Sequence, residues 1–257
     1  MSDPYILETR ALTKEFKGFV AVSKVDLKVR RGSIHALIGP NGAGKTTCFN
    51  LLTKFLTPTS GQIVFDGTDI TGESPAHIAR RGVIRSFQIS AVFPHLSVLE
   101  NVRIGLQRFT GTSFHFWKGL AGLRTLDAKV LELLEMVDLR DMAQLQAADL
   151  PYGRKRALEI ATTMAMSPEL MLLDEPTQGM GHEDVDRVTA LIKRVAEGRT
   201  VLMVEHNMRV VSRIADRITV LARGAVLAEG QYEEVSRHPA VLEAYMGSEA
   251  TELAGAH

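Results

Sequence analysis

Residues 34–47, which read IHALIGPNGAGKTT, constrain the fold of this 257-residue chain more than any other stretch. A short apolar strand leads through a glycine-rich loop into a helix, and the loop matches G-x-x-x-x-G-K-[ST] from Gly39 to Thr46. Glycines let backbone N–H groups converge on phosphate oxygens, the helix N-terminus adds its positive dipole end, and Lys45 adds a full charge. The stretch predicts a nucleoside triphosphate site, with the Thr46 hydroxyl available to the accompanying Mg²⁺. An ordinary glycine-rich turn is the weaker interpretation, because strand, loop and helix agree.

The composition is that of a globular protein. Hydrophobic residues make up 45% and charged residues 23%, enough for a sizeable core in one large or two modest domains. Thirty basic residues balance thirty acidic ones, so the whole chain has no electrostatic footprint for nucleic acid, although a local patch stays open. The single cysteine, Cys48, has no disulfide partner, which suits a reducing compartment; we expect a buried small residue rather than a reactive thiol.

The N-terminus lacks the basic start and long apolar run of a signal peptide. No window approaches 18 apolar residues. We therefore expect a cytosolic protein that reaches a membrane only by docking to a partner that spans it.

Strand signals dominate the first third of the chain. Short runs of Val, Ile and Leu within residues 5–38 predict antiparallel strands that lead into the loop. Residues 60–65 and 83–87 predict two further strands, the second ending at Gln88. Between them, Ser74 is a good N-cap for a short helix, with Pro75 at its first position.

Helix-period patterns replace the strand signals over residues 89–165. Leucines and valines recur at steps of three and four between residues 123 and 137, which makes one apolar helix face. The aromatic-rich segment 109–117 is either an exposed docking surface or a loop packed against these helices, and packing is favoured. The pattern predicts a helical subdomain.

Strand and helix alternate again after Pro168, which predicts a parallel sheet with helical crossovers. The expected elements are strands at 170–173 and 200–204, helices at 183–195 and 207–214, a hairpin of 218–221 and 225–228, and short helices to Tyr245.

Together these patterns predict an α/β fold: a P-loop NTPase core with a mixed sheet, an N-terminal antiparallel β region and an inserted helical subdomain. We expect one domain over residues 1–250. Its nucleotide-binding core comprises residues 1–88 and 166–250, the helical subdomain comprises residues 89–165, and residues 251–257 form a flexible tail.

Two carboxylates, Asp174 and Glu175, follow the apolar strand at 170–173. Ligands of open parallel sheets bind outside the carboxyl ends of the strands, so these acids and the phosphate loop are expected in one crevice. One acid suits Mg²⁺ through its water, and the next suits an attacking water. The alternative is that both acids merely cap a helix. The next buried strand ends in Glu205 and His206, and we favour a γ-phosphate contact for His206 over a structural role.

Five motifs occur in the order and spacing of an ABC-transporter ATPase subunit, which the chain resembles over nearly its whole length. They are the loop 39–47, Gln88, the Leu150-Pro151-Tyr152-Gly153-Arg154 stretch, Asp174-Glu175-Pro176 and His206. The sequences LPYG and LEIA, and the ending from Ala228-Glu229-Gly230 to Tyr245-Met246-Gly247, are similar to the branched-chain amino-acid importer subfamily. This resemblance implies the ABC ATPase fold, ATP and Mg²⁺ as ligands, and two copies that sandwich two ATP molecules head to tail.

The resemblance also implies a role for each matching residue. Glu175 corresponds to the general base, His206 to the γ-phosphate switch, and Gln88 to a metal and water contact that signals to the membrane subunits. Thr46, Gln88 and Asp174 correspond to the metal site. The expected nucleotide-binding residues are Phe16, as an adenine-stacking ring rather than a strand-end core residue, with Gly39, Pro40, Asn41, Gly42, Ala43, Gly44, Lys45, Thr46, Thr47, Tyr152 and Gly153.

Residues 151–154 depart from the widespread Leu-Ser-Gly-Gly-Gln signature. Pro151 removes a hydroxyl and an N–H group, although Gly153 at the start of a helix still offers an anion site that would face the opposite subunit's γ-phosphate. Arg154 either adds charge toward phosphate or lies on the solvated face with Lys155 and Arg156, and the solvated face is favoured. Gly181 lies in a loop without the usual Asp, which weakens the expected cross-dimer contact.

The resulting hypothesis is an ATP-hydrolysing subunit that powers an importer from the cytoplasmic face of the membrane as a peripheral protein. Its expected partners are a second ATPase subunit, identical or not, permease subunits and, indirectly, a solute-binding protein; nucleic acid is not expected. Branched-chain amino acids are the favoured cargo, with amides, urea or aromatic acids as alternatives. One rival hypothesis is a non-transport ABC ATPase in DNA repair or translation. The other is a P-loop kinase, but a kinase would not account for the LPYG stretch or for His206.

Overall fold

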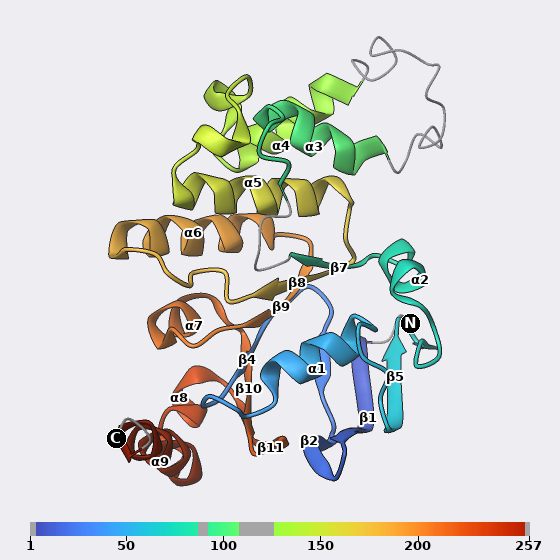
Figure 1. The fold of residues 1–257 in the computed structure, drawn as a ribbon, viewed down its shortest axis with the longest axis vertical. Coiled ribbons are helices and arrows are strands. Elements are labelled where there is room, and N and C mark those ends of the chain that lie inside the picture. Colours follow the sequence, from blue (N-terminus) through green and yellow to red (C-terminus); the bar gives the residue numbers. More distant parts are fainter. Residues whose placement is uncertain (1–3, 87–91, 108–125, 255–257) are drawn as a thin grey trace.

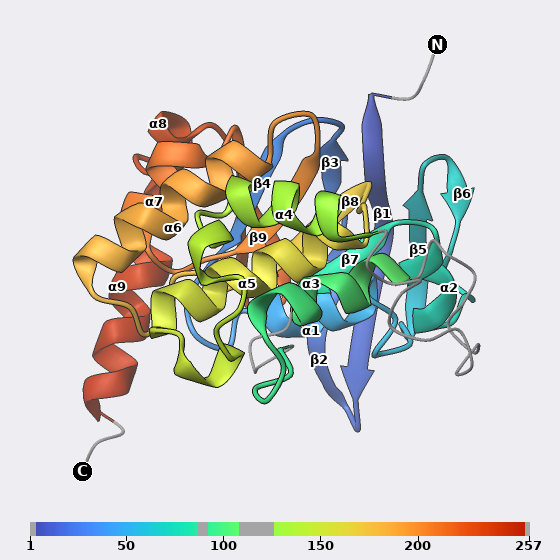
Figure 2. The same cartoon turned by 90° about the horizontal axis from the view of Figure 1, so that it is seen from above.

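The computed structural model describes residues 4–86, 92–107 and 126–254. Two sheets and a group of helices form its layers (Figure 1). Helices α3, α4 and α5 lie at one end of the long axis, and strands β1 and β2 with helix α1 lie toward the other end. Seen from above, α9 and strand β5 lie on opposite sides of the molecule (Figure 2).

The larger sheet has six strands in the order β11-β10-β4-β9-β8-β7. The neighbours from β10 through β7 pair in parallel, and only β11 pairs antiparallel, in a hairpin with β10. This mixed sheet and its terminal hairpin confirm the sequence prediction. The strands are β4 (Ile34–Ile38), β7 (Val83–Ser86), β8 (Leu170–Asp174), β9 (Thr200–Val204), β10 (Arg217–Ala222) and β11 (Ala225–Gly230).

Strand β4 corrects one expectation. Residues 34–38 were predicted as the last of a set of antiparallel strands, but β4 pairs in parallel with β9 and β10. All five of its residues are buried, because helices and the second sheet cover both faces of the larger sheet.

The smaller, antiparallel sheet has the order β2-β1-β5-β6, with β3 also paired to β1. The Val-, Ile- and Leu-rich region of residues 5–38 is divided at Asp26, and the strands on either side of Asp26 pair with different stretches of β1. The strands are β1 (Tyr5–Phe16), β2 (Phe19–Val25), β3 (Lys28–Arg30), β5 (Ser60–Phe65) and β6 (Thr68–Asp69).

The helices follow the predicted order. Ser74 caps α2, its Oγ accepting the His77 N–H at 3.3 Å, as the sequence indicates. Helix α9 continues nine residues past Tyr245, where the sequence suggested that the helices end. The α-helices are α1 (Lys45–Leu52), α2 (Pro75–Arg80), α3 (Val98–Gln107), α4 (Asp127–Met136), α5 (Tyr152–Ala165), α6 (His182–Val195), α7 (Met208–Ile214), α8 (Tyr232–Val235) and α9 (Pro239–Ala254), with 3₁₀ helices at Arg140–Met142 and Ala147–Asp149.

Two apolar cores lie on the two faces of the larger sheet. Met171 and Leu173 of β8 belong to the core beneath α3 to α7, whereas Leu170 and Leu172 belong to the core shared with α1 and the antiparallel sheet. This alternation buries β8 on both faces and leaves only its carboxyl end for polar chemistry. In the described part of the chain, no helix has the length and apolar character needed to cross a membrane.

Candidate functional site

The glycine-rich loop joins β4 to α1 at the carboxyl edge of the larger sheet. Gly39, Gly42 and Gly44 have φ angles of 150°, 74° and 97°, which favour glycine. A Cβ atom on Gly39 would lie 2.1 Å from the Leu221 carbonyl oxygen, and one on Gly44 would lie 2.4 Å from that of Ala21. The loop therefore fits between its neighbours because these positions lack a side chain.

Lys45 is the first residue of α1 and folds back over the loop. Its Nζ donates to the carbonyl oxygens of Gly39 at 2.7 Å and Pro40 at 2.9 Å, and the residue is only 8% exposed. Burial lowers the pKa of the Lys45 ammonium, and the neighbouring Glu175 carboxylate opposes that shift. The two charges are therefore close enough to interact across the carboxyl edge of the sheet.

The other loop residues divide into buried and accessible positions. Ala43 is buried, and its carbonyl oxygen accepts the Gly224 N–H at 3.1 Å. Asn41 and Thr46 are exposed, and Thr47 is half-buried. Farther along α1, Cys48 is fully buried, and burial raises the pKa of its thiol to about 12, as expected for a packed residue rather than a nucleophile.

Asp174 ends strand β8 and is almost fully buried. Its Oδ2 forms an ion pair with the Arg85 guanidinium of β7, and Arg85 Nη1 also donates to Asn50 Oδ1 of α1 at 2.6 Å. Sequence reasoning missed Arg85. The carboxylate predicted for the metal site is thus held by a cation from the neighbouring strand.

Glu175 follows directly and has a left-handed backbone, with φ at 43°. Its N–H donates to the Val204 carbonyl oxygen at 2.9 Å, which extends the β8–β9 pairing by one residue. A non-glycine residue in this region is uncommon and is found where surrounding structure holds it. The side chain of Glu175 is half-buried at the same edge as Lys45.

Glu205, the last residue before His206, is fully buried and joins two loops. Its Oε1 accepts the Thr177 N–H at 3.1 Å and the Thr177 hydroxyl at 2.6 Å. Its Oε2 accepts the N–H groups of His206 at 3.0 Å and Asn207 at 3.1 Å. The carboxylate therefore fixes the loop after β8 to the loop after β9 and leaves His206 exposed at the sheet edge.

The donor set at this edge fits Mg²⁺. Magnesium takes oxygen ligands, keeps several waters and is usually bound through one or two carboxylates plus substrate phosphates. Thr46 offers an exposed hydroxyl and Asp174 a carboxylate, whereas no cluster of three His, Cys, Asp or Glu side chains suited to a metal occurs among the described residues. Gln88, the third predicted contact, lies outside the described residues.

The N-terminus of α5 carries the LPYG stretch. Pro151 is the N-cap, and its carbonyl oxygen accepts the N–H groups of Arg154 and Lys155, both at 2.9 Å. The first N–H groups of a helix have no intrahelical acceptor, and this applies to those of Tyr152 and of Gly153, which is buried. Tyr152 is 60% exposed, and its hydroxyl donates to the Gln178 carbonyl oxygen at 3.2 Å.

Arg156 corrects the expectation of a solvated basic face. Arg154 is half-buried and donates to the Asp138 carbonyl oxygen at 2.7 Å, but Arg156 is buried and donates to the loop that carries Asp174 and Glu175. The buried face of α5 also includes Glu159, Ile160 and Thr163. That helical spacing was the available sequence signal, and the basic run Arg154-Lys155-Arg156 concealed it.

Phe16 ends β1, opposite Phe19 in the hairpin with β2. Its ring is 41% exposed, and Lys14 Nζ lies 5.1 Å from the ring centroid. An exposed ring with a cation over it is unlike a buried strand-end core residue.

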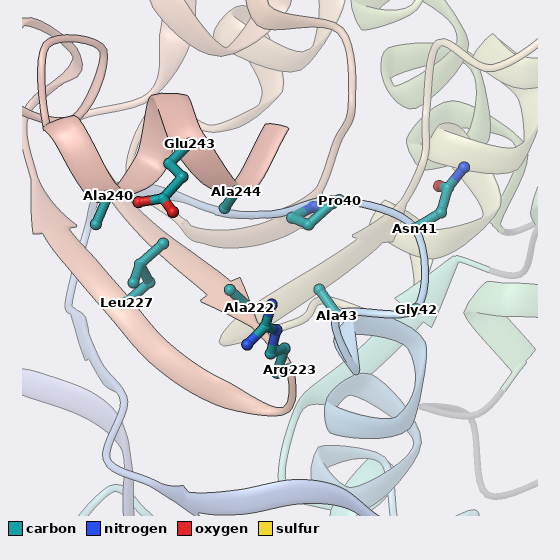
Figure 3. A pocket seen from close by; sticks show the side chains of 10 residues that line it. All are labelled: Pro40, Asn41, Gly42, Ala43, Ala222, Arg223, Leu227, Ala240, Glu243 and Ala244. Atoms are coloured by element: carbon teal, nitrogen blue, oxygen red, sulfur yellow. The ribbon is translucent and has the colours of Figure 1, made fainter. Parts of the chain in front are cut away.

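A cavity of about 520 Å³ lies beside the phosphate loop, between the β10–β11 turn and α9 (Figure 3). It is lined by Pro40, Asn41, Gly42, Ala43, Ala222, Arg223, Leu227, Ala240, Glu243 and Ala244. Lys45, Glu175 and His206 do not line it. This cavity is therefore not where these three predicted catalytic residues lie.

Known proteins resemble this chain in sequence and in fold. The ABC transporter family model matches residues 22–178, and the branched-chain amino acid ATP-binding cassette transporter model matches residues 225–251. The chain is 41% identical to the high-affinity branched-chain amino acid transport ATP-binding protein BraF of Pseudomonas aeruginosa, over 96% of this chain and 99% of that protein. It is 37% identical to LivG of Escherichia coli, with the same coverage. The solved ADP conformation of MJ1267, an ATP-binding cassette of an ABC transporter, superposes with a TM-score of 0.83 at 28% identity, covering 95% of this chain and 99% of that chain.

Proposed function

The chain belongs to the ABC transporter ATP-binding family, and from that premise we propose that it is the ATP-hydrolysing subunit of an importer for branched-chain amino acids. Family membership supports ATP binding and ATP hydrolysis coupled to transport. The match of residues 225–251 and the names of the relatives favour branched-chain amino acids over amides, urea or aromatic acids as the cargo.

One observation carries the site assignment: Lys45, after β4, and Glu175, after β8, both lie at the carboxyl edge of the larger sheet, close enough for their charges to interact. Lys45 occupies the phosphate loop by bonding to Gly39 and Pro40, and Glu175 is near enough to oppose the shift in its pKa. A cation suited to phosphate and a carboxylate suited to water are thus at the same edge of the sheet, as hydrolysis of a phosphoanhydride requires.

The chemistry assigned to these residues is largely positioning and charge neutralisation. On binding, the phosphates take the Lys45 ammonium away from the loop carbonyls. The Glu175 carboxylate then orients a water and accepts its proton, and the exposed His206 contacts the γ-phosphate. Thr46 and Asp174 would hold Mg²⁺, which when bound neutralises phosphate charge.

The N-terminus of α5 supplies the second half of the site in this proposal. The N–H groups of Tyr152 and Gly153, which have no acceptor within the helix, would face the γ-phosphate held by another subunit, because a helix N-terminus attracts an anion. The proposed assembly is therefore a dimer of ATPase subunits on the cytoplasmic face of permease subunits, with a solute-binding protein on the other side of the membrane.

Replacement of the proposed base tests the assignment. Glu175→Gln is expected to leave ATP affinity intact and to lower turnover by roughly 10² to 10⁴, the usual value of a positioned general base. ATP binding is measured by titration calorimetry, and turnover by phosphate release from the assembled transporter. Glu183→Gln, the same change at an exposed position of α6, is the control and should turn over like the parent. Turnover of Glu175→Gln within about threefold of the parent would refute the role.

The cargo and the rival functions need a separate experiment. The tagged chain, purified from detergent extracts, should carry permease subunits. ATP turnover of the reconstituted complex should then rise with the solute-binding protein and a branched-chain amino acid, and not with urea or an amide. Purification with nucleic acid or ribosomes, and without membrane proteins, would contradict the importer assignment.

A further inference from the structure

Arg156 lies one helical turn inside α5 and reaches the loop that carries the proposed base. Its Nη2 donates to the carbonyl oxygens of Asp174 at 2.9 Å and Glu175 at 3.1 Å, and its Nε donates to that of Pro176 at 3.1 Å. The side chain is only 9% exposed. One guanidinium thus bonds three consecutive backbone carbonyls around the left-handed Glu175.

Glu159 holds the guanidinium in this orientation. Arg156 Nη1 donates to Glu159 Oε2 at 2.5 Å, and the Glu159 side chain is 10% exposed. Burial raises the pKa of Glu159, and Arg156 opposes that shift. A buried ion pair is costly to desolvate, so the pair by itself adds little net stability. The planar fork of arginine suits several fixed acceptors at once, whereas lysine presents a single ammonium point.

The loop is also held at its far end. Glu205 bonds Thr177 on one oxygen and the backbone of His206 and Asn207 on the other. Tyr152, in the first turn of α5, bonds Gln178 of the same loop. The 174–178 loop is therefore hydrogen-bonded to the segment after β9 on one side and to α5 on the other.

These contacts join two places that serve different nucleotides. The N-terminus of α5 is assigned to the nucleotide of the opposite subunit, whereas Glu175 serves the nucleotide of its own subunit. We propose that Arg156 is a positioning residue that couples the two sites. Its hydrogen bonds link the position of α5 at one nucleotide to the position of the backbone that presents Glu175 to the other nucleotide. The coupling rests on the proposed function.

Mixed dimers test the coupling. Two differently tagged copies of the chain are assembled with the membrane subunits, and one copy carries Glu175→Gln, so that a single base remains. Arg156→Lys, which keeps the charge and loses the fork, is then placed either in the copy with the intact base or in the other copy. Coupling predicts that residual turnover falls about tenfold in both placements, because either change misplaces one half of the active site.

A local role gives a different result. If Arg156 supports only Glu175, Arg156→Lys lowers turnover only in the copy with the intact base. If Arg156 supports only the α5 N-terminus, Arg156→Lys lowers turnover only in the other copy. Either outcome, or no effect in both placements, overturns the coupling. Arg213→Lys, an exposed position on α7, is the control and should leave turnover unchanged.

A second variant protects the test against misfolding. Glu159→Gln keeps the shape of the side chain, leaves Arg156 in place and should lower turnover in both placements by a smaller factor, about threefold. Thermal melting is measured for every subunit. If turnover falls only as the folded fraction falls, Arg156 is merely structural and the proposal fails. A parent dimer without ATP turnover would instead overturn the proposed function, and the coupling with it.

Discussion

The N-termini of α1 and α5 are both suited to an anion, but their charges differ. Neither helix begins with a capping side chain, whereas Ser74 caps α2 and Asn207 caps α7. At α1 the Lys45 ammonium is folded over the loop. At α5 the nearest arginine of the buried face, Arg156, turns inward, and a carboxylate lies beside the first turn, because a Cβ atom on Gly153 would be 2.7 Å from Asp184 Oδ1.

This difference separates binding from hydrolysis. A helix end with its own cation attracts phosphate more strongly than one whose unbonded N–H groups lie beside a carboxylate. In the proposed dimer, the α5 end acts only when the loop of another subunit brings the phosphate to it. The α1 loop, whose motif alone looks like a complete nucleotide site, is one half of the site in that proposal.

The largest expected effect contrasts the two ends directly. Lys45→Ala should weaken ATP binding by the chain alone by about 2–5 kcal/mol, or roughly 30-fold and upward, because it removes one partner of a buried charge pair. Gly153→Ala should change the same affinity by less than about twofold. Titration calorimetry on the purified chain measures both. An equal loss of affinity in the two variants would show that both helix ends bind the same nucleotide, and would contradict the different roles given to α1 and α5.

The next largest expected effect is on the pH dependence of stability, through the buried titratable groups behind the N-termini of α1 and α5. Behind α1, His35 of β4 is buried with Nε2 2.8 Å from Thr219 Oγ1, and burial, with a smaller contribution from Arg217, lowers its pKa to about 4. Above pH 6.5 folded and unfolded chains both carry neutral His35, and its contribution to stability is complete. As pH falls from 6.5 to 4, only the unfolded chain gains the proton, so the free energy of unfolding should fall by about 3 kcal/mol.

Urea denaturation at pH 7 and pH 4.5 measures this loss. The double variant His35→Leu with Thr219→Val removes both polar partners and should lose most of the histidine-dependent slope. His77→Gln, at an exposed position of α2, is the control and should keep the slope. Behind α5 the buried acid Glu159 has a raised pKa, so acid should not destabilise that end in the same way. An unchanged slope in the double variant would assign the acid sensitivity to other groups.

The two ends also differ in how much the sequence reveals. The α1 loop could be predicted because its glycines, its lysine and its helix start are adjacent in the chain, and the conformations they impose are local. Most of the strands and helices followed from periodicity for the same reason. The parallel pairing of β4 did not, because it depends on which strands lie beside it.

The support of the α5 end was hidden for a physical reason. Arg156 bonds to the backbone carbonyls of residues 174–176, and Glu205 bonds to the backbone N–H of Thr177, all distant in the sequence. Every residue type carries such groups, so no pattern in the sequence marks the partners. Arg85, by contrast, pairs with the Asp174 side chain across parallel strands. Only the strand register brings those two charges together.

The smallest expected effect isolates the carboxylate beside α5. Gly153→Ala would force its Cβ against Asp184 Oδ1, and because that oxygen is the end of a flexible side chain, the helix end should shift only slightly. Turnover of the assembled transporter should fall by about three- to tenfold, while the chain alone keeps its ATP affinity.

The double variant Gly153→Ala with Asp184→Ala removes the obstructing group and should recover turnover to within about twofold of Asp184→Ala alone. Recovery of turnover would show that the defect of Gly153→Ala comes from the contact with Asp184. The rate of phosphate release would then depend on how α5 packs against α6. Persistence of the defect in the double variant would mean that the methyl group itself blocks the opposite subunit's phosphate, and the α5 N-terminus would then lie closer to that phosphate than the packing alone requires.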